Sequence, residues 1–359
     1  MKRIIVSVTN DLVTDQRVDK TCEVLSEIGF QVILVGRKLN KSLPIHRNYK
    51  IKRFRLFFNN GVLFYAEYNI RLFLFLLFSK KEILFSNDLD TLLPNYLIGK
   101  LQRKKIIFDS HELFSEIPEL VHKKIVKKIW LYIERRIIPK LQNIITVSES
   151  IKNHYYNLYG VSATVIRNVP KTNEINRINL EEVTKGKKII LYQGSVNIGR
   201  GIELMIETMP LLKDYLFIVV GDGDILDNLK KKVNTLSLQR KVIFIGKKTP
   251  EELKKITPNA SIGMSLEEDI GLNYRYALPN KIFDYIHGNV PIVASNLPEM
   301  KFIIEKYAIG ELLKERTSKV LANIILKMTE KDYNNNLKDA VKELNWEKEK
   351  DKLIKIFKS

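Results

Sequence analysis

A strand, a helix and a second strand, joined by short connections, are predicted in the first 35 residues. This pattern constrains the fold more than any other feature of the chain. Residues 4–8 and 31–35 are apolar runs rich in β-branched side chains, and residues 16–28 between them carry a helical pattern that ends at Gly29. Two strands connected through a helix run parallel. The sequence therefore predicts an α/β fold built on parallel sheets.

The same alternation continues along the chain and predicts two domains. Further strands are expected at residues 83–85, 105–108, 143–147, 163–166, 188–192, 217–220, 242–245 and 260–264. With 359 residues, two α/β domains are the natural division. We place an N-terminal domain at 1–170, a polar linker at 171–186 and a C-terminal domain at 187–343; residues 36–80 read as irregular.

The charge of the chain calls for an anionic partner. The formal net charge is +19, and residues 1–170 carry 28 Lys and Arg against 15 Asp and Glu, so most of the excess lies in the N-terminal half. The apolar segment 62–78 is interrupted by Glu67, Asn69 and Arg71, which favours a soluble or membrane-surface protein over an integral one. A single cysteine excludes an intrachain disulfide and a cysteine-cluster metal site.

Residues 122–140 have the pattern of a basic amphipathic helix. Lys and Arg side chains surround an isoleucine stripe made of Ile125, Ile129, Ile133 and Ile137. Such a helix can lie on an anionic bilayer. It can equally be an ordinary domain helix whose stripe packs on the sheet and whose cations are solvated, and both interpretations stay open.

A short helix opened by Pro279 carries Asn280, Lys281 and Asp284 and leads into a strand at 290–294. A cation and a carboxylate at a helix start, beside the ends of parallel strands, suit a nucleotide diphosphate. The cation and the helix N–H groups meet phosphate, and the carboxylate meets ribose hydroxyls. The alternative is a surface helix with an internal salt bridge.

Glycine turns follow two predicted strands of the C-terminal domain. Residues 193–201 contain Gly194 and Gly201, with Arg200 able to bind a phosphate, and Gly221 and Gly223 form a second turn. Glycine lets backbone N–H groups come close to a phosphate.

In the N-terminal domain, the strand at 105–108 delivers His111 and Glu112 to the edge of the sheet where ligands gather. A lone histidine can also be purely structural. Asp88 and Asp90 have the spacing of a metal-binding pair but lie in the basic domain, and we interpret them as loop residues.

These motifs resemble the donor site of GT-B glycosyltransferases, especially family 4. That family has an acidic residue seven positions before a Pro-(Val/Ile)-Val-Ala-Ser turn, here Asp284 and residues 291–295. The loop with Asp15 and Arg17 also looks like the opening of family 4 enzymes, although both residues fit a helix cap and a solvated charge. The resemblance implies two Rossmann-like domains facing across a cleft, with a helix at 344–359 crossing back to the first domain.

The resemblance also implies the site. Donor binding falls to Gly194, Ser195, Arg200, Gly201, Gly221, Gly223, Asn280, Lys281 and Asp284, and His111 and Glu112 are the catalytic candidates. Two positions depart from the family pattern. Ser195 stands where an arginine is usual, so Lys281 bears more of the diphosphate charge. Tyr276 stands where a glutamate contacts the donor sugar, and Glu267, Glu268, Asp269 and Asn273 are substitutes from the same loop.

The function implied is transfer of a hexosyl or N-acetylhexosaminyl group from a nucleotide-diphosphate sugar to a glycan or lipid-linked glycan, with retention of configuration and without metal or cofactor. The setting implied is cell-surface polysaccharide or lipopolysaccharide synthesis, in the cytoplasm and peripheral at the inner face of the membrane. One alternative is a nucleotide-sugar epimerase of the same fold. A nucleic-acid-binding protein is suggested only by charge, and the basic residues alternate with aliphatics rather than with base-stacking aromatics.

Overall fold

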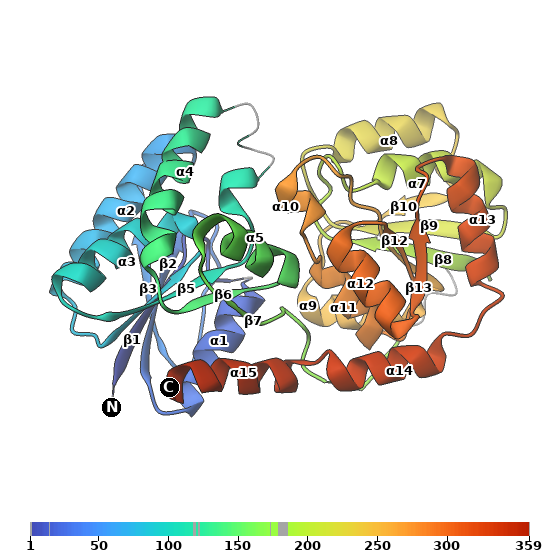
Figure 1. Cartoon of the computed structure of the whole chain (residues 1–359). Coiled ribbons are helices and arrows are strands. Elements are labelled where there is room, and N and C mark those ends of the chain that lie inside the picture. Colours follow the sequence, from blue (N-terminus) through green and yellow to red (C-terminus); the bar gives the residue numbers. More distant parts are fainter. Residues whose placement is uncertain are drawn as a thin grey trace. The chain divides into compact units, whose positions relative to one another are not determined.

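The computed structural model describes residues 2–13, 15–117, 120, 123–172, 174–178 and 186–358 (Figure 1). The chain divides into two compact units. The N-terminal unit comprises Met1–Asn168, Gly271–Asn273 and Glu349–Ser359, and the C-terminal unit comprises Val169–Ile270 and Tyr274–Lys348. Much of the expected linker, residues 173 and 179–185, lies outside the described residues.

Within the described residues, the N-terminal unit contains a seven-stranded parallel sheet of strand order β3-β2-β1-β4-β5-β6-β7. The strands are β1 (Arg3–Ser7), β2 (Gln31–Lys38), β3 (Lys50–Arg55), β4 (Ile83–Asn87), β5 (Lys105–Ser110), β6 (Ile144–Thr146) and β7 (Thr164–Val165). The strand order reverses between β1 and β4. Ligands of open α/β sheets bind outside the carboxyl ends of the strands at such a reversal.

Helices connect these strands except β2 and β3, which a loop joins, so the repeated strand–helix pattern holds for most of the unit. They are α1 (Gln16–Glu27), α2 (Gly61–Phe78), α3 (Leu89–Leu101), α4 (Lys124–Ile137) and α5 (Glu149–Tyr159). The expectation that residues 36–80 are irregular is wrong, because they form β3 and α2. The helix escapes a periodicity argument because its apolar residues are not confined to one face: Tyr68 and Leu72 are buried, while Ile70 and Leu74 on the other face are exposed.

By length and hydropathy, α2 is of the kind that could cross a membrane, and it is the one such helix among the described residues. Helices in the cores of soluble proteins pass the same test. Only 22% of α2 is buried in the fold, however, which is low for a core helix.

The isoleucine stripe expected on α4 does not pack on the sheet as a unit. Trp130, Glu134 and Ile137 form the buried face of this helix, whereas Ile125 is 77% exposed and Ile129 is 49% exposed. The stripe therefore splits between the interior and the solvent. The first residue of the predicted segment, His122, lies outside the described residues.

The C-terminal unit has a six-stranded parallel sheet of strand order β10-β9-β8-β11-β12-β13, counted over the described residues. The strands are β8 (Lys188–Gln193), β9 (Tyr215–Val220), β10 (Val242–Phe244), β11 (Ile262–Ser265), β12 (Ile292–Ser295) and β13 (Gly310–Leu313). The helices are α7 (Ile202–Thr208), α8 (Leu226–Thr235), α9 (Pro250–Ile256), α11 (Asn280–His287), α12 (Pro298–Tyr307), α13 (Ser318–Met328) and α14 (Asn334–Glu343). The short helix α10 (Leu272–Arg275) is shared, because its residues up to Asn273 belong to the N-terminal unit. Here the strand order reverses between β8 and β11.

The last helix, α15 (Trp346–Lys358), packs most of its length on the N-terminal unit. The Phe357 ring stacks on Phe85 with 6.2 Å between ring centroids and meets Phe30 edge-on at 5.6 Å. The backbone N–H of Arg167 donates to Glu349, which is buried. The predicted return of the C-terminal helix to the first domain is confirmed.

Candidate functional site

Two glycine turns lie against each other at the ends of β8 and β9. A Cβ added at Gly221 would come within 1.8 Å of the Gly194 carbonyl oxygen, and one at Gly223 within 2.5 Å of the Val196 carbonyl oxygen. The N–H groups of Gly194 and Gly221 already donate to carbonyls of the fold, at 3.0 Å each. These glycines therefore provide close approach between backbone segments rather than free amide donors.

Gly201, at the start of α7, also allows a close approach between two backbone segments. Its φ of +71° is in the left-handed region, and an added Cβ would meet the Leu266 carbonyl oxygen at 2.3 Å. The glycine thus brings the first turn of α7, with Arg200 just before it, against the segment that follows β11.

Two predicted cations converge on one carboxylate at this point. The Lys281 Nζ is 2.8 Å from Glu267 Oε1, and the Arg200 Nη1 is 3.7 Å from the same oxygen. The side chain of Glu267 is fully buried and Lys281 is nearly so, while Arg200 is partly exposed. Burial by itself raises the pKa of a carboxyl group, yet Lys281 and Arg200 hold the pKa of Glu267 below its ordinary value. The three groups keep a net charge of +1.

Aromatic rings cover both cations. The Lys281 Nζ lies 4.0 Å from the centroid of the Tyr192 ring, and the Arg200 guanidinium lies 4.8 Å from that of Tyr274. These rings hold the two cations in place. Lys281 also lies beside the first glycine turn, because a Cβ added at Gly194 would be 3.9 Å from the Lys281 Cε.

Glu267 is one of the four residues that the sequence offers in place of the family glutamate, and the structure places it between the two cations. The Ser265 hydroxyl donates to its Oε2 at 2.7 Å, and Arg316 donates to the carbonyl oxygens of Leu266 and Glu267 at 3.1 and 3.3 Å. Arg316 therefore holds the backbone that carries this carboxylate. Arg316 lies about fifty residues after this segment in the sequence, so the sequence did not predict the contact.

The other candidates from this loop are placed elsewhere. Glu268 pairs with Arg316 at 3.4 Å, and Asp269 pairs with Arg275 at 2.6 Å on the surface. Tyr276 is half-buried.

Asp284 is held by the last residue of β8. The Gln193 Nε2 donates to Asp284 Oδ2 at 2.8 Å, and the Gln193 Oε1 accepts a hydrogen bond from the Thr257 hydroxyl at 2.7 Å. Lys281 and Asp284 therefore do not form the internal salt bridge of the alternative reading. They reach partners at the ends of β11 and β8, the two strands where the sheet order reverses. Asn280 is exposed at the first position of α11.

In the N-terminal unit, His111 lies between two carboxylates. Its Nε2 is 3.2 Å from Asp109 Oδ2 and its Nδ1 is 3.2 Å from Asp88 Oδ2, while its backbone N–H donates to Asp88 Oδ1 at 2.8 Å. Burial works against protonation, but Asp88 and Asp109 raise the pKa of His111 to about 9. The ring is therefore an imidazolium at neutral pH.

Arg17 completes this cluster. It binds Asp109 through two hydrogen bonds of 2.7 and 3.0 Å and donates to the Ile166 carbonyl at 2.7 Å. Although burial acts in the opposite direction, Arg17 and His111 hold the pKa of Asp109 far below its ordinary value. Arg17 is buried, so it is not the solvated helix charge of the alternative reading, while Asp15 does cap α1 by accepting from the Val18 N–H.

Asp88 and Asp90 are not simply loop residues. Asp88 is the N-cap of α3 with a φ of +57°, and Asp90 lies in the first turn of this helix. Burial and the Asp88 carboxylate raise the pKa of Asp90 to about 8. No sequence pattern marked Asp88 as a partner of His111.

Glu112 lies beside this cluster and is held by Asn273. The Asn273 Nδ2 donates to Glu112 Oε2 at 3.1 Å, and the Asn273 Oδ1 accepts from the Leu113 N–H at 3.0 Å. Asn273 belongs to the short segment Gly271–Asn273 of the N-terminal unit. Among the residues that the structure describes, no group of three His, Cys, Asp or Glu is placed to hold a metal ion.

Comparison with known proteins identifies the family. Residues 16–172 match the family model described as Glycosyltransferase Family 4, and residues 174–344 match that of Glycosyl transferases group 1. An uncharacterised glycosyltransferase of Methanocaldococcus jannaschii, MJ1607, is 23% identical over 239 residues, which are 60% of this chain. The match spans 59% of that relative's length.

Solved structures agree in fold. Sucrose-phosphate synthase from Thermosynechococcus elongatus superposes with a TM-score of 0.82 at 15% identity, over 100% of this chain and 98% of the other. The Anabaena protein HepE in complex with UDP-glucose superposes with a TM-score of 0.75 at 13% identity, over 100% of both chains. With two Rossmann-like domains and family matches along nearly its whole length, the chain belongs to the family 4 glycosyltransferases of GT-B fold.

Proposed function

We propose that the chain transfers a sugar from a nucleotide-diphosphate sugar to a glycan or lipid-linked glycan acceptor. The observation that carries this proposal is the convergence of Arg200 and Lys281 on Glu267, where the sheet of the C-terminal unit reverses its strand order. The cluster retains a net positive charge, which suits a diphosphate, and it lies beside two glycine turns in which the backbone segments approach closely. The complex of the Anabaena neighbour with UDP-glucose supports a uridine nucleotide as the first donor to test.

In this proposal the two cations stabilise the diphosphate as it leaves. Negative charge develops on the leaving group during transfer, and preorganised cations aimed at that charge lower the barrier. Glu267 keeps Arg200 and Lys281 fixed before the donor binds, so little reorganisation is needed at the moment of reaction. Asp284, held by Gln193, accepts hydrogen bonds from the ribose hydroxyls.

His111 acts through charge and position rather than as a base. Both ring nitrogens already face carboxylates, and an imidazolium has no lone pair with which to take a proton. Glu112 follows His111 in the sequence and is oriented by Asn273. In this proposal the Glu112 carboxylate contacts the acceptor. We further propose that transfer proceeds with retention of configuration, needs neither metal nor cofactor, and moves a hexosyl or N-acetylhexosaminyl group.

The acceptor and setting extend the proposal. The basic N-terminal half fits an anionic membrane surface that carries a lipid-linked glycan. We place the protein in the cytoplasm, peripheral at the inner face of the cell membrane, in the synthesis of cell-surface polysaccharide or lipopolysaccharide.

Calorimetric titration with UDP, ADP and GDP tests the donor site. We expect one nucleotide to bind the unaltered protein and Asp284→Ala to lose that binding while remaining folded. Asp269→Ala is the matched control, because it removes an exposed carboxylate whose partner is the exposed Arg275. Unchanged affinity in Asp284→Ala would remove Asp284 from the site.

A second measurement separates transfer from epimerisation. The nucleotide sugar that stabilises the protein most is incubated with and without an acceptor extract, and the products are analysed. Sugar transfer only in the presence of acceptor is expected. Conversion of the donor to an epimer without acceptor would instead assign the epimerase activity.

A further inference from the structure

One whole face of α2 is apolar and exposed. Side chains spaced four residues apart line it from end to end, namely Val62, Ala66, Ile70, Leu74 and Phe78. Phe78 is 82% exposed. Apolar surface that runs unbroken along a helix in this way marks an interaction site.

The opposite face of α2 fixes the helix to the fold. The Tyr68 hydroxyl donates to the Val8 carbonyl at 2.6 Å, and Leu72 and Leu76 are fully buried. The charged residues of the helix, Glu67 and Arg71, pair with each other at 2.7 Å. The helix therefore cannot leave the unit to cross a membrane. It presents about 24 Å of apolar surface, at about 1.5 Å per residue, from a fixed position.

Helix α4 contacts α2 and carries exposed cations of its own. Trp130 of α4 meets Tyr65 of α2 edge-on with 5.2 Å between ring centroids, and α3 packs against both helices. Ile125 and Ile129, the exposed part of the split isoleucine stripe, lie on the outer face of α4 together with Lys128.

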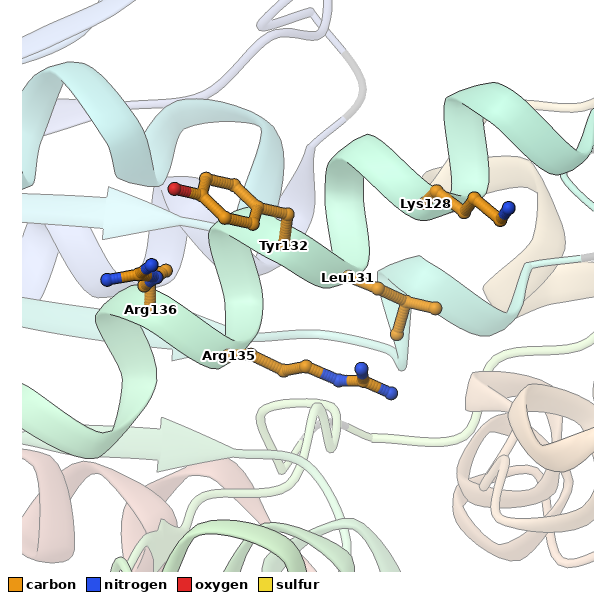
Figure 2. A pocket seen from close by; sticks show the side chains of 5 residues that line it. All are labelled: Lys128, Leu131, Tyr132, Arg135 and Arg136. Atoms are coloured by element: carbon orange, nitrogen blue, oxygen red, sulfur yellow. The ribbon is translucent and has the colours of Figure 1, made fainter.

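A shallow pocket runs along the same helix. As Figure 2 shows, its lining comes entirely from α4, with cationic and apolar side chains interleaved: Lys128, Leu131, Tyr132, Arg135 and Arg136. The Arg136 guanidinium lies 5.3 Å from the centroid of the exposed Tyr132 ring. Cations beside an aromatic ring and exposed isoleucines have the composition of a helix that lies at a lipid headgroup layer.

We propose that the exposed faces of α2 and α4 form a membrane-docking surface, with α2 among the acyl chains and the α4 cations on anionic lipid phosphates. Charge complementarity selects this occupant. The other candidate occupant is a second copy of the chain. In a two-fold contact the same surface of both copies would meet, which would bring the α4 cations of the two copies together. The membrane location was suggested under the proposed function, and this proposal assigns it to a specific surface. It does not depend on the donor site.

Co-sedimentation of the full chain with vesicles tests this surface. Vesicles of phosphatidylcholine alone are compared with vesicles that also contain phosphatidylglycerol, at low and high salt. We expect partition to the anionic vesicles only, and weaker partition at high salt. Lys128→Glu should weaken it about thirtyfold, because one attractive cation is lost and a repulsive charge is added.

Ile70→Glu tests the apolar half of the surface, with an expected loss of partition of at least about tenfold. Leu326→Glu on α13 of the C-terminal unit is the matched control, since it likewise replaces an exposed aliphatic side chain by glutamate, and it should partition like the unaltered protein. The replaced side chains are exposed, so melting temperatures and nucleotide titrations should be unchanged.

Three results would overturn the proposal. These are absence of partition to anionic vesicles, equal partition of all variants, and self-association in solution that Ile70→Glu abolishes. Because nucleotide binding is measured on the same variants, failure of the membrane surface is distinguishable from failure of the donor site.

Discussion

Replacing Lys281 by methionine should destabilise the C-terminal unit, because it leaves the buried Glu267 carboxylate without its nearest cation. Removing one partner of a buried ion pair costs about 3–5 kcal/mol. Arg200 remains 3.7 Å away and the Ser265 hydroxyl still donates to the carboxylate. These two contacts offset part of the loss, so we expect unfolding to become easier by about 2–3 kcal/mol at neutral pH.

The loss should depend on pH with a defined sign. In the unaltered protein the pKa of Glu267 is below its ordinary value, so the pair stabilises the fold above about pH 4.3, the unfolded pKa. That stabilisation is lost as the pH falls through the folded pKa. In Lys281→Met, burial dominates and the pKa of Glu267 rises. The deficit should therefore be largest at neutral pH and shrink as the carboxyl group is protonated.

Urea unfolding of the full chain at about pH 7.5 and about pH 5.5 measures this effect, and the transition that added UDP shifts reports the C-terminal unit. The double variant Lys281→Met with Glu267→Gln removes the buried charge and should recover most of the loss. Lys301→Met, which breaks an exposed pair with Glu305, should have little effect. A single variant as stable as the unaltered protein, or a double variant no more stable than the single one, would refute the reasoning.

Two further changes probe the other features of the site. Asp88→Asn should lower the pKa of His111 toward its ordinary value of about 6.5. We therefore expect the pH–rate profile of this variant to gain a limb near that pH that the profile of the unaltered protein does not have. A pH–rate profile without that limb contradicts the assignment of Asp88. Gly221→Ala should weaken nucleotide binding at least about tenfold, since the new Cβ collides with the Gly194 carbonyl. Gly160→Ala, where an added Cβ meets nothing within 4 Å, is the calorimetric control.

The regular parts of the fold could be predicted because their signals are local. The first strand, helix and strand fall at Arg3–Ser7, Gln16–Glu27 and Gln31–Lys38, within a few residues of the expected bounds. Glycine turns and the Pro279 helix were visible in the same way, as fixed residue types next to an apolar run. The family motif then predicted which of the loops that follow the strands form one site together.

The residues that were missed act through long-range contacts. Asp88 reaches His111 across two neighbouring strands, and Arg316 reaches the segment after β11 from fifty residues downstream, so no periodicity or spacing could pair them. Glu267 was one acid among several in its loop, and only burial distinguishes it. The helix α2 escaped because both of its faces are apolar, which removes the contrast that periodicity detects.

The packing of α15 has a consequence for how the protein is made. Leu353 and Phe357 fill positions against a domain whose strands come almost entirely from the first half of the chain. A ribosome has to synthesise the chain as far as these residues before their side chains reach their places. The N-terminal domain therefore stays incomplete until then, and a chain without residues 349–359 should have an uncovered patch in the core of that domain.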